Sequence, residues 1–214
     1  RRTSLLAEDF EKLRTQLTIP EEVELKSMYG LAPAASKIYQ VERGFSIGGY
    51  GEAFYRKAVG DKTRSDRDTA DFLRFVLYTG YKFNDWILFN AELEFEHATT
   101  DGTETSSGGS ASVEFAYLDF LLQQEYDLPF NVRMGMLLVP MGIVNELHEP
   151  VFFHGVERPE VEQRIIPTTW RENGIGVWGQ LTPQLEYRLY GINGLNAKGF
   201  RDDGFRGGRQ KGNR

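Results

Sequence analysis

Hydrophobic and polar residues alternate with a period of two over most of the chain after residue 44, a pattern that predicts β-strands. In residues 87–96 every second residue is apolar, while Glu92, Glu94 and Glu96 share the opposite face. Each strand is therefore expected to have one apolar face and one charged face. Seven strands are expected, over residues 44–56, 73–82, 87–96, 112–123, 130–139, 174–181 and 184–193.

The segment 112–123 departs from simple alternation. Val113, Phe115 and Tyr117 fall on the same face as Asp119. Either a β-bulge shifts the alternation within this strand, or both of its faces are partly buried.

The first 43 residues follow different patterns. Apolar residues at positions 6, 10, 13 and 17 are spaced as on one face of a helix, which predicts a short amphipathic or coiled-coil-like helix over residues 1–19. This helix either rests on another part of the protein or associates with copies of itself. Residues 20–43 contain Gly30, Pro33 and several small residues and are expected to form a connector before the sheet at 44–214.

The connections between the expected strands alternate between long and short. Residues 58–70, 98–111 and 140–173 are long, whereas residues 83–85, 124–129 and 182–183 are short. An antiparallel sheet with this order has one end with tight turns and another with large loops. Outer-membrane barrels have short periplasmic turns and long external loops.

Three features favour an apolar face that contacts lipid. The expected strands reach the roughly 9–11 residues needed to cross a bilayer at a tilt. Aromatic residues gather near the ends of strands, as in an interfacial girdle: Tyr81, Phe83, Trp86, Tyr126 and Phe130. After residue 20 no long helix is expected that would cover a broad apolar sheet.

Composition excludes several other classes of protein. The chain has no cysteine, which excludes disulfide scaffolds and thiolate metal sites, and its longest apolar run is too short for a membrane-spanning helix. The net charge of −6 argues against nucleic-acid binding, in spite of the basic tail 206–214. This tail is expected to be a flexible external loop. The chain begins at Arg1 without Met or an apolar export segment, so we expect a mature chain or a piece of a longer one.

The motifs that suggest enzyme chemistry have simpler interpretations. Residues 174–179 match G-x-G-x-x-G, but strand and turn residues follow them instead of a helix, which indicates a glycine-rich strand. His148 and His154 flank Pro150 and are not spaced as a helical zinc pair, so they are expected to be ordinary loop histidines. The row of glutamates on residues 92–96 is expected to be solvated or lumenal. We expect no catalytic residues, no metal and no cofactor.

Residues 140–173 form the most informative connection, because loops of this length tend to be functional. The segment mixes aromatic residues with dense charge. Either it packs on the rim of the barrel, or it folds into the lumen, narrows the pore and sets selectivity by its charges.

Several segments, in order, resemble the phosphate-selective porin family of Gram-negative outer membranes. They are GFSIGGYGE at 44–52, FNAELEFEH at 89–97, AYLDF at 116–120, RMGMLLVPMG at 133–142, ERP at 157–159, NGIG at 173–176 and ING at 192–194. The resemblance covers about residues 40–214. It implies an antiparallel transmembrane β-barrel, of which this chain would supply about seven of 16 strands, preceded by the short N-terminal helix.

The resemblance also implies a water-filled channel, as a homotrimer in outer-membrane lipid, for passive diffusion of small polar or charged solutes, including anions such as phosphate. It places Arg133 on a lumen face and makes Arg158, Arg164 and Arg171 candidates for the constricting loop at about 140–173. Seven strands do not close such a barrel, and the loop carries about as many carboxylates as arginines.

We therefore expect a diffusion channel without catalytic chemistry, in which charges of both signs line the pore. Opposed charges across a narrow pore create a transverse field that biases which solutes pass. The candidate pore-lining or constriction residues are Arg74, Arg133, Arg158, Arg164, Arg171, Arg188, Glu92, Glu94 and Glu96.

Two alternatives stay open. One is a soluble or secreted β-sandwich that binds a carbohydrate or protein ligand, with the aromatic loop 150–173 as its platform. The other is a barrel with a plugged lumen that acts as an anchor or adhesin.

Overall fold

The computed structural model describes residues 24–57, 59, 68–97, 109–166, 169–202 and 204–209. The helix expected over residues 1–19 lies outside these ranges, as do the first residues of the expected connector.

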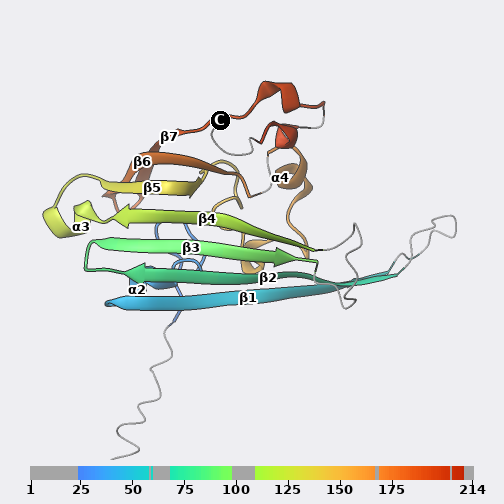
Figure 1. Ribbon diagram of the computed structural model, residues 1–214, viewed down its shortest axis with the longest axis horizontal. Coiled ribbons are helices and arrows are strands. Elements are labelled where there is room, and N and C mark those ends of the chain that lie inside the picture. The colour runs from blue at the N-terminus through green and yellow to red at the C-terminus, as the bar shows by residue number, and fades with distance from the viewer. Residues whose placement is uncertain are drawn as a thin grey trace, which may run out of the picture.

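The described residues form one antiparallel sheet whose strands follow one another in sequence order (Figure 1). The sheet is open, with β1 and β7 as its two edges. The expectation of a mostly β, antiparallel protein is thus confirmed, without closure into a barrel. The strands are β1 (Gly44–Arg56), β2 (Thr69–Lys82), β3 (Ile87–Glu96), β4 (Ser110–Phe120), β5 (Asn131–Leu138), β6 (Arg171–Thr182) and β7 (Leu185–Ile192).

The alternation of long and short connections is confirmed. The short connections follow β2, β4 and β6 and lie together at one end of the sheet, on the left in Figure 1. The long ones follow β1, β3 and β5, and these three strands end at the opposite end of the sheet. The G-x-G-x-x-G segment 174–179 lies wholly within β6, so it is a strand and not the start of a helix.

A β-bulge explains the irregular pattern of β4. Glu92 of β3 pairs with Phe115, whereas the next residue, Leu93, pairs with Val113. Glu114 is therefore the extra residue, and it is buried on the same side as Phe115. Beyond the bulge Val113 turns to the opposite face, where it is exposed.

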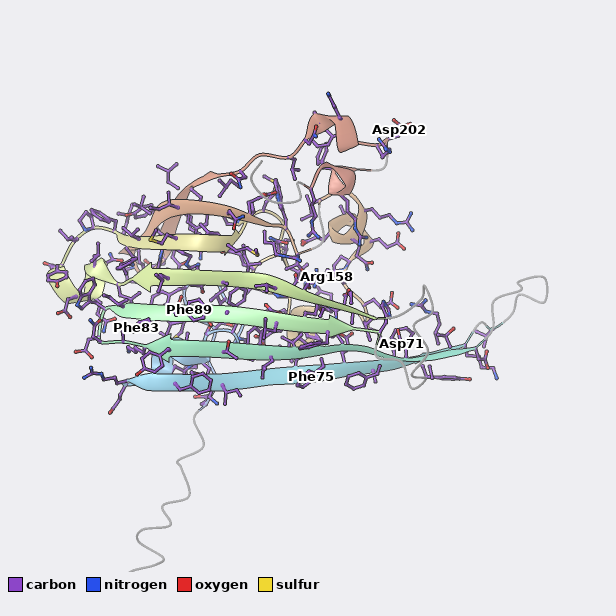
Figure 2. The ribbon with its side chains drawn as sticks, in the orientation of Figure 1. Asp71, Phe75, Phe83, Phe89, Arg158 and Asp202 are labelled. Atoms are coloured by element: carbon purple, nitrogen blue, oxygen red, sulfur yellow. The ribbon has the colours of Figure 1, made fainter. Side chains whose placement is uncertain are left out.

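One face of the sheet, here called the outer face, is apolar and exposed. A row of directly paired residues crosses it from β1 to β6: Phe45, Tyr81, Phe89, Leu118, Met134 and Ile175. Phe45 is 65% exposed and Ile175 52%, and Leu189 of β7 reaches 71%. Phe75 and Phe89, labelled in Figure 2, also belong to this face. No described segment packs over these side chains.

The opposite face, here called the inner face, is polar but buried. Glu92 and Asp119 are fully buried there, and Arg133 is 3% exposed. The segment 24–43, with its short helix α2 (Lys37–Gln40), and the described residues of the long loop 139–170 cover this face. The core lies between them and the sheet, and it contains Leu31, Ile38, Tyr39, Tyr78, Phe115, Tyr117, Leu137 and Trp178. Residues 24–43, expected only as a connector, thus form part of the core.

Short helices complete the fold and correct two expectations. The strand expected to reach residue 123 ends at Phe120, because the backbone turns into α3 (Leu122–Tyr126), which Asn131 holds by accepting the Gln123 N–H at 2.9 Å. The expected flexible tail is folded in its described part. There Phe205 donates its N–H to the Ile165 carbonyl at 2.9 Å. The other helices among the described residues are η1 (Pro150–Phe152), α4 (Glu160–Arg164), η2 (Ala197–Gly199) and η3 (Arg206–Gly208).

Candidate functional site: a charged inner face

The long loop 139–170 is fastened at its two ends by one side chain. The Asn145 amide donates to the carbonyls of Val139 at 2.7 Å and Trp170 at 2.9 Å, and its oxygen accepts the Trp170 N–H. A second anchor comes from α4, where the Glu162 carboxylate accepts the N–H groups of Ile143 and Val144. These bonds hold the loop in a compact form over the inner face.

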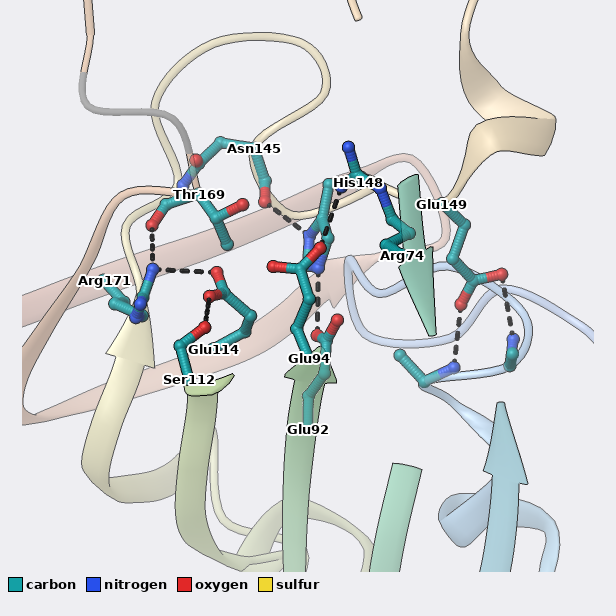
Figure 3. A network of polar contacts seen from close by, with 12 residues as sticks. Arg74, Glu92, Glu94, Ser112, Glu114, Asn145, His148, Glu149, Thr169 and Arg171 are labelled. Carbon is teal, nitrogen blue, oxygen red and sulfur yellow. Dashed lines mark hydrogen bonds and ion pairs between the residues drawn. The ribbon is translucent and has the colours of Figure 1, made fainter. Parts of the chain in front are cut away.

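The loop reaches the sheet through a buried histidine. His148 Nε2 lies 2.9 Å from a carboxylate oxygen of Glu92 on β3, and Nδ1 lies 3.0 Å from the Asn145 carbonyl (Figure 3). Both side chains are almost fully buried, at 4% and 0% exposure. Burial alone would lower the pKa of His148, but the adjacent Glu92 carboxylate outweighs it and raises the pKa above its ordinary value.

Glu149, the residue after His148, binds the N-terminal segment. The Glu149 carboxylate accepts the backbone N–H groups of Ala34 at 3.2 Å and Ala35 at 2.9 Å. From the sheet, the Asn90 amide donates to the Ala35 carbonyl at 3.0 Å. Burial raises the pKa of Glu149, and the two backbone donors oppose that rise. Loop, N-terminal segment and sheet thus meet around residues 148–149.

A second cluster is centred on Arg133 of β5. Its guanidinium makes two bonds of 2.8 Å to the Asp119 carboxylate and a third, of 3.0 Å, to the Tyr39 hydroxyl. The guanidinium also lies over the rings of Tyr117 and Trp178, 4.3 and 5.1 Å from their centroids. Such bidentate pairing satisfies a buried charge that would otherwise be very costly. This cluster has no free charge for a ligand.

Toward the end of the sheet with the long loops, arginines and glutamates alternate across neighbouring strands. Arg74 of β2 contacts Glu52 of β1 and Glu94 of β3, each at 2.9 Å. Farther along, Arg171 of β6 donates to Glu114 of β4 at 2.8 Å. Each pair is at most about one-fifth exposed, so these charges neutralise one another with little screening from solvent.

Two cavities lie beside these pairs, of about 300 and 210 Å³. They share Arg74, Glu96, Arg158 and Arg206 in their walls. Together the two walls contain six arginines and five glutamates. The complete set of charged wall residues is Glu52, Arg56, Arg74, Glu94, Glu96, His97, Glu114, Glu157, Arg158, Arg171, Arg206 and Arg209.

Arg158 differs from the other arginines of the cavities. Its side chain is buried, Nη1 donates to Thr169 Oγ1 at 3.0 Å, and Nε and Nη2 have no hydrogen-bond partner among the described residues. The side chain lies toward the end of the sheet opposite Phe83 (Figure 2). Burial, followed by repulsion from Arg74, lowers the pKa of Arg158. Burial and the neighbouring Arg171 lower the pKa of Arg209 to about 10. In both cases burial is the largest cause, and a neighbouring arginine is the second.

The structure brings some of the predicted site residues together and separates others. Five of them share the wall of the smaller cavity: Arg74, Glu94, Glu96, Arg158 and Arg171. Glu92 pairs with His148, and Arg133 lies beneath the N-terminal segment. Arg188 of β7 lies 3.5 Å from Glu146 of the loop. Arg164 points away from the cavities, since it is 67% exposed and pairs with Glu160 one turn earlier in α4.

Sequence reasoning missed several members of this network. His148 was expected to be an ordinary loop histidine, yet it is buried, while His154 is exposed. Glu114 escaped notice because the bulge moves it onto the inner face. Arg206 and Arg209 were assigned to a flexible tail. In the sequence, only the polar alternation of β3 and β4 indicates this network. The contacts between distant parts of the chain produce no local pattern.

No protein-family model matches the chain, and no solved structure matches it. The chain is 48% identical over 189 residues to a protein of Aquifex aeolicus (strain VF5) whose own description is "uncharacterized". The match covers 88% of this chain and 41% of that protein, so the chain spans about two-fifths of the relative's length. No helix in the described part of the chain is long and apolar enough to cross a membrane.

Proposed function

We propose that this chain is part of an outer-membrane diffusion channel, a porin, through which small polar or charged solutes pass passively. The observation that carries the proposal is the inverted distribution of side chains on the sheet. The apolar face is exposed on all seven strands, whereas the charged face is buried under the loop and the N-terminal segment. A sheet in water has the opposite arrangement, and a barrel in lipid has this one.

The ends of the sheet support the same proposal. At the end with short turns, Trp86 lies 5.7 Å from Tyr126 and 6.2 Å from Phe120, and Tyr81 lies 5.0 Å from Phe83, between ring centroids. Aromatic side chains grouped in this way are typical of the boundary between lipid and water.

The open edges also fit part of a larger barrel. Strands β1 and β7 each have one edge without a neighbour among the described residues. The Aquifex relative is more than twice as long as the matched segment, which leaves length for further strands to close the sheet. A homotrimer of 16-stranded barrels, as the family resemblance implies, is the assembly we propose.

The charges around the two cavities favour anions among the solutes. Four of the five glutamates in the walls are held by arginines: Glu52 and Glu94 by Arg74, Glu114 by Arg171 and Glu157 by Arg56. Arg158 keeps two donors without partners, and a guanidinium edge of this kind suits a carboxylate or a phosphate. The loop at the cavities thus acts as the constriction, with an anion preference set by Arg158.

The test is planar-bilayer conductance of the full-length protein, purified in detergent, with reversal potentials measured in a salt gradient. Stepwise conductance with a preference for anions is expected. A protein that stays monodisperse in buffer without detergent and never conducts would overturn the proposal. The β-sandwich binding module would then replace it, with the outer face covered by another sheet.

A further inference from the structure

The two ring nitrogens of His148 both face hydrogen-bond acceptors. Nδ1 faces the Asn145 carbonyl at 3.0 Å, and Nε2 faces a Glu92 carboxylate oxygen at 2.9 Å. A neutral imidazole has one N–H and one lone pair, so it satisfies only one of these acceptors. The observed geometry therefore requires one more proton, held either by the imidazole or by the Glu92 carboxyl.

Removal of that proton leaves one of the two acceptors without a donor: with Nε2–H the Nδ1 lone pair faces the Asn145 carbonyl, and with Nδ1–H the Nε2 lone pair faces Glu92. With Nδ1–H still bonded to the Asn145 carbonyl, the Nε2 lone pair would face a carboxylate oxygen in a region without exposure to solvent. The second oxygen of Glu92 has no hydrogen-bond partner among the described residues, so the carboxylate would lose its only one. A buried, unpaired carboxylate is strongly unfavourable, and solvation of Glu92 requires that the loop move away.

Other charged groups face this pair from each neighbouring element. Glu114 on β4 favours the protonated histidine, and Arg158, farther along the same loop, opposes it. The carboxylate of Glu149 lies next in sequence, and the hydroxyls of Tyr50 and Tyr78, on β1 and β2, lie near Glu92. The balance favours the proton, since Glu92 raises the pKa of His148 above the ordinary value of about 6.5.

We propose that His148 and Glu92 form a proton-dependent latch, which holds the loop 139–170 against the inner face when the pair is protonated and releases it when the proton is lost. A group whose pKa is raised on docking stabilises the docked state fully below about pH 6.5 and loses that contribution as the pH rises through the raised pKa. The loop is therefore docked below about pH 6.5 and loosened as the pH rises through the raised pKa of His148. Because Glu149 is the adjacent residue, its bonds to the N-terminal segment weaken with the latch.

Hydrogen exchange measured by mass spectrometry on the full-length protein tests the latch without reference to transport. Protection factors, which correct for the intrinsic pH dependence of exchange, are measured for peptides from residues 139–166 between about pH 6 and 9. Protection is expected to fall at least about tenfold as the pH rises, while peptides from the paired strands β2 and β3 change little. Constant protection across the range would overturn the proposal.

Three variants separate the latch from general instability at high pH. In Glu92→Gln the side-chain amide donates to a neutral Nε2, so the loop is expected to stay protected at every pH. His148→Gln, whose amide donates to Glu92 without titrating, is expected to do the same and serves if Glu92→Gln does not fold. His154→Gln is the matched control, because His154 is an exposed histidine of the same loop. This variant is expected to keep the wild-type pH dependence. If the loop of either latch variant loses as much protection with rising pH as the wild-type loop does, the proposal is contradicted.

The effect of the latch on transport rests on the proposed channel function. If the loop forms the constriction, single-channel conductance of wild type and His154→Gln is expected to change as the pH rises, while Glu92→Gln keeps one conductance. A protein that never conducts but shows the expected exchange pattern would overturn the channel and support the latch. A protein that conducts but shows pH-independent protection of the loop would support the channel and overturn the latch.

Discussion

The inner face shows how individual charges are kept where solvent is absent. Asp119 and Arg133 are 0% and 3% exposed, and their bidentate pair is completed by the Tyr39 hydroxyl. Arg158 is buried to a similar extent but leaves two donors without partners. The first arrangement is closed and structural, whereas the second is open toward the cavities. At this scale, pairing rather than residue type distinguishes a structural arginine from a candidate ligand-binding one.

Loss of Arg133 is expected to destabilise the fold strongly. Arg133→Met leaves the Asp119 carboxylate buried without a counter-charge, and we expect the free energy of unfolding to fall by about 3–5 kcal/mol in urea titrations of the protein in detergent. Arg164→Met, which removes an exposed i,i+4 pair, is the control and is expected to cost about 0.5 kcal/mol or less. Addition of Asp119→Asn to Arg133→Met is expected to recover part of the loss. A loss no larger than that of the control would contradict a buried ion pair.

Arg158 is expected to control ion preference. Arg158→Gln removes a unit charge from both cavity walls, and one such charge about 4 Å from a permeating ion changes its energy by about 1 kcal/mol even in water. We expect the anion-to-cation permeability ratio, from reversal potentials, to fall about fivefold or more. Arg164→Gln, outside the cavities, is expected to leave the ratio unchanged. Equal ratios in wild type and Arg158→Gln would remove Arg158 from the constriction.

Among the elements, the N-terminal segment 24–43 contributes more side chains to the core than its composition suggests. It is irregular apart from α2, yet Leu31, Ile38 and Tyr39 are buried in the core cluster. Ile38 packs at Gly80 of β2, where a Cβ atom would lie 2.9 Å from the isoleucine side chain. The missing side chain at residue 80 lets the segment approach the sheet closely, so α2 packs directly on the inner face.

Ile38→Ala is expected to loosen this segment. Removal of a buried isoleucine side chain costs about 2–5 kcal/mol, since a cavity remains beside Gly80. We expect the urea midpoint of unfolding to fall and hydrogen exchange in peptides from residues 24–43 to rise. Leu25→Ala, at an exposed position of the same segment, is the control and is expected to stay within about 0.5 kcal/mol of wild type. Similar exchange in the two variants would show that the segment is not part of the core.

At the scale of the whole molecule, the two faces of the sheet have exchanged their usual roles. Exposed apolar side chains occur on every strand, and the buried interior contains ion pairs between strands of the sheet and between the loop and the sheet. Contiguous exposed apolar surface of this kind marks a face that contacts lipid or another protein. The proposed membrane environment makes a direct prediction for that face.

A charge on the outer face is expected to be costly in lipid and harmless in water. Ile175→Lys places an ammonium on the exposed face of β6, and near the bilayer midplane we expect folding into lipid vesicles to weaken by about 2–4 kcal/mol. Val156→Lys, at an 82% exposed position in the loop, is the control and is expected to change vesicle folding little. Equal vesicle folding of both variants would show that the outer face does not meet lipid.

The strands themselves were largely predictable. Alternation over residues 87–96 matches β3 at both ends, and the connection lengths anticipated which strand ends lie together. The errors fell where tertiary contacts compete with local pattern. Arg171 and Glu172 do not look like strand residues, yet β6 begins there because they pair with Leu137 and Leu138. β4 stops at Phe120 because Asn131 supports α3.

By itself, then, the sequence determined the seven strands, their antiparallel order and the division into an apolar and a charged face, since a period of two is a local property of the chain. Only the tertiary structure decided which face is covered. The segment 24–43 and the loop 139–170 lie over the charged face, and Glu92 finds its partner 56 residues away in His148. No local pattern encodes such a contact, because its stability comes from the loss of solvent around both groups when distant segments pack together.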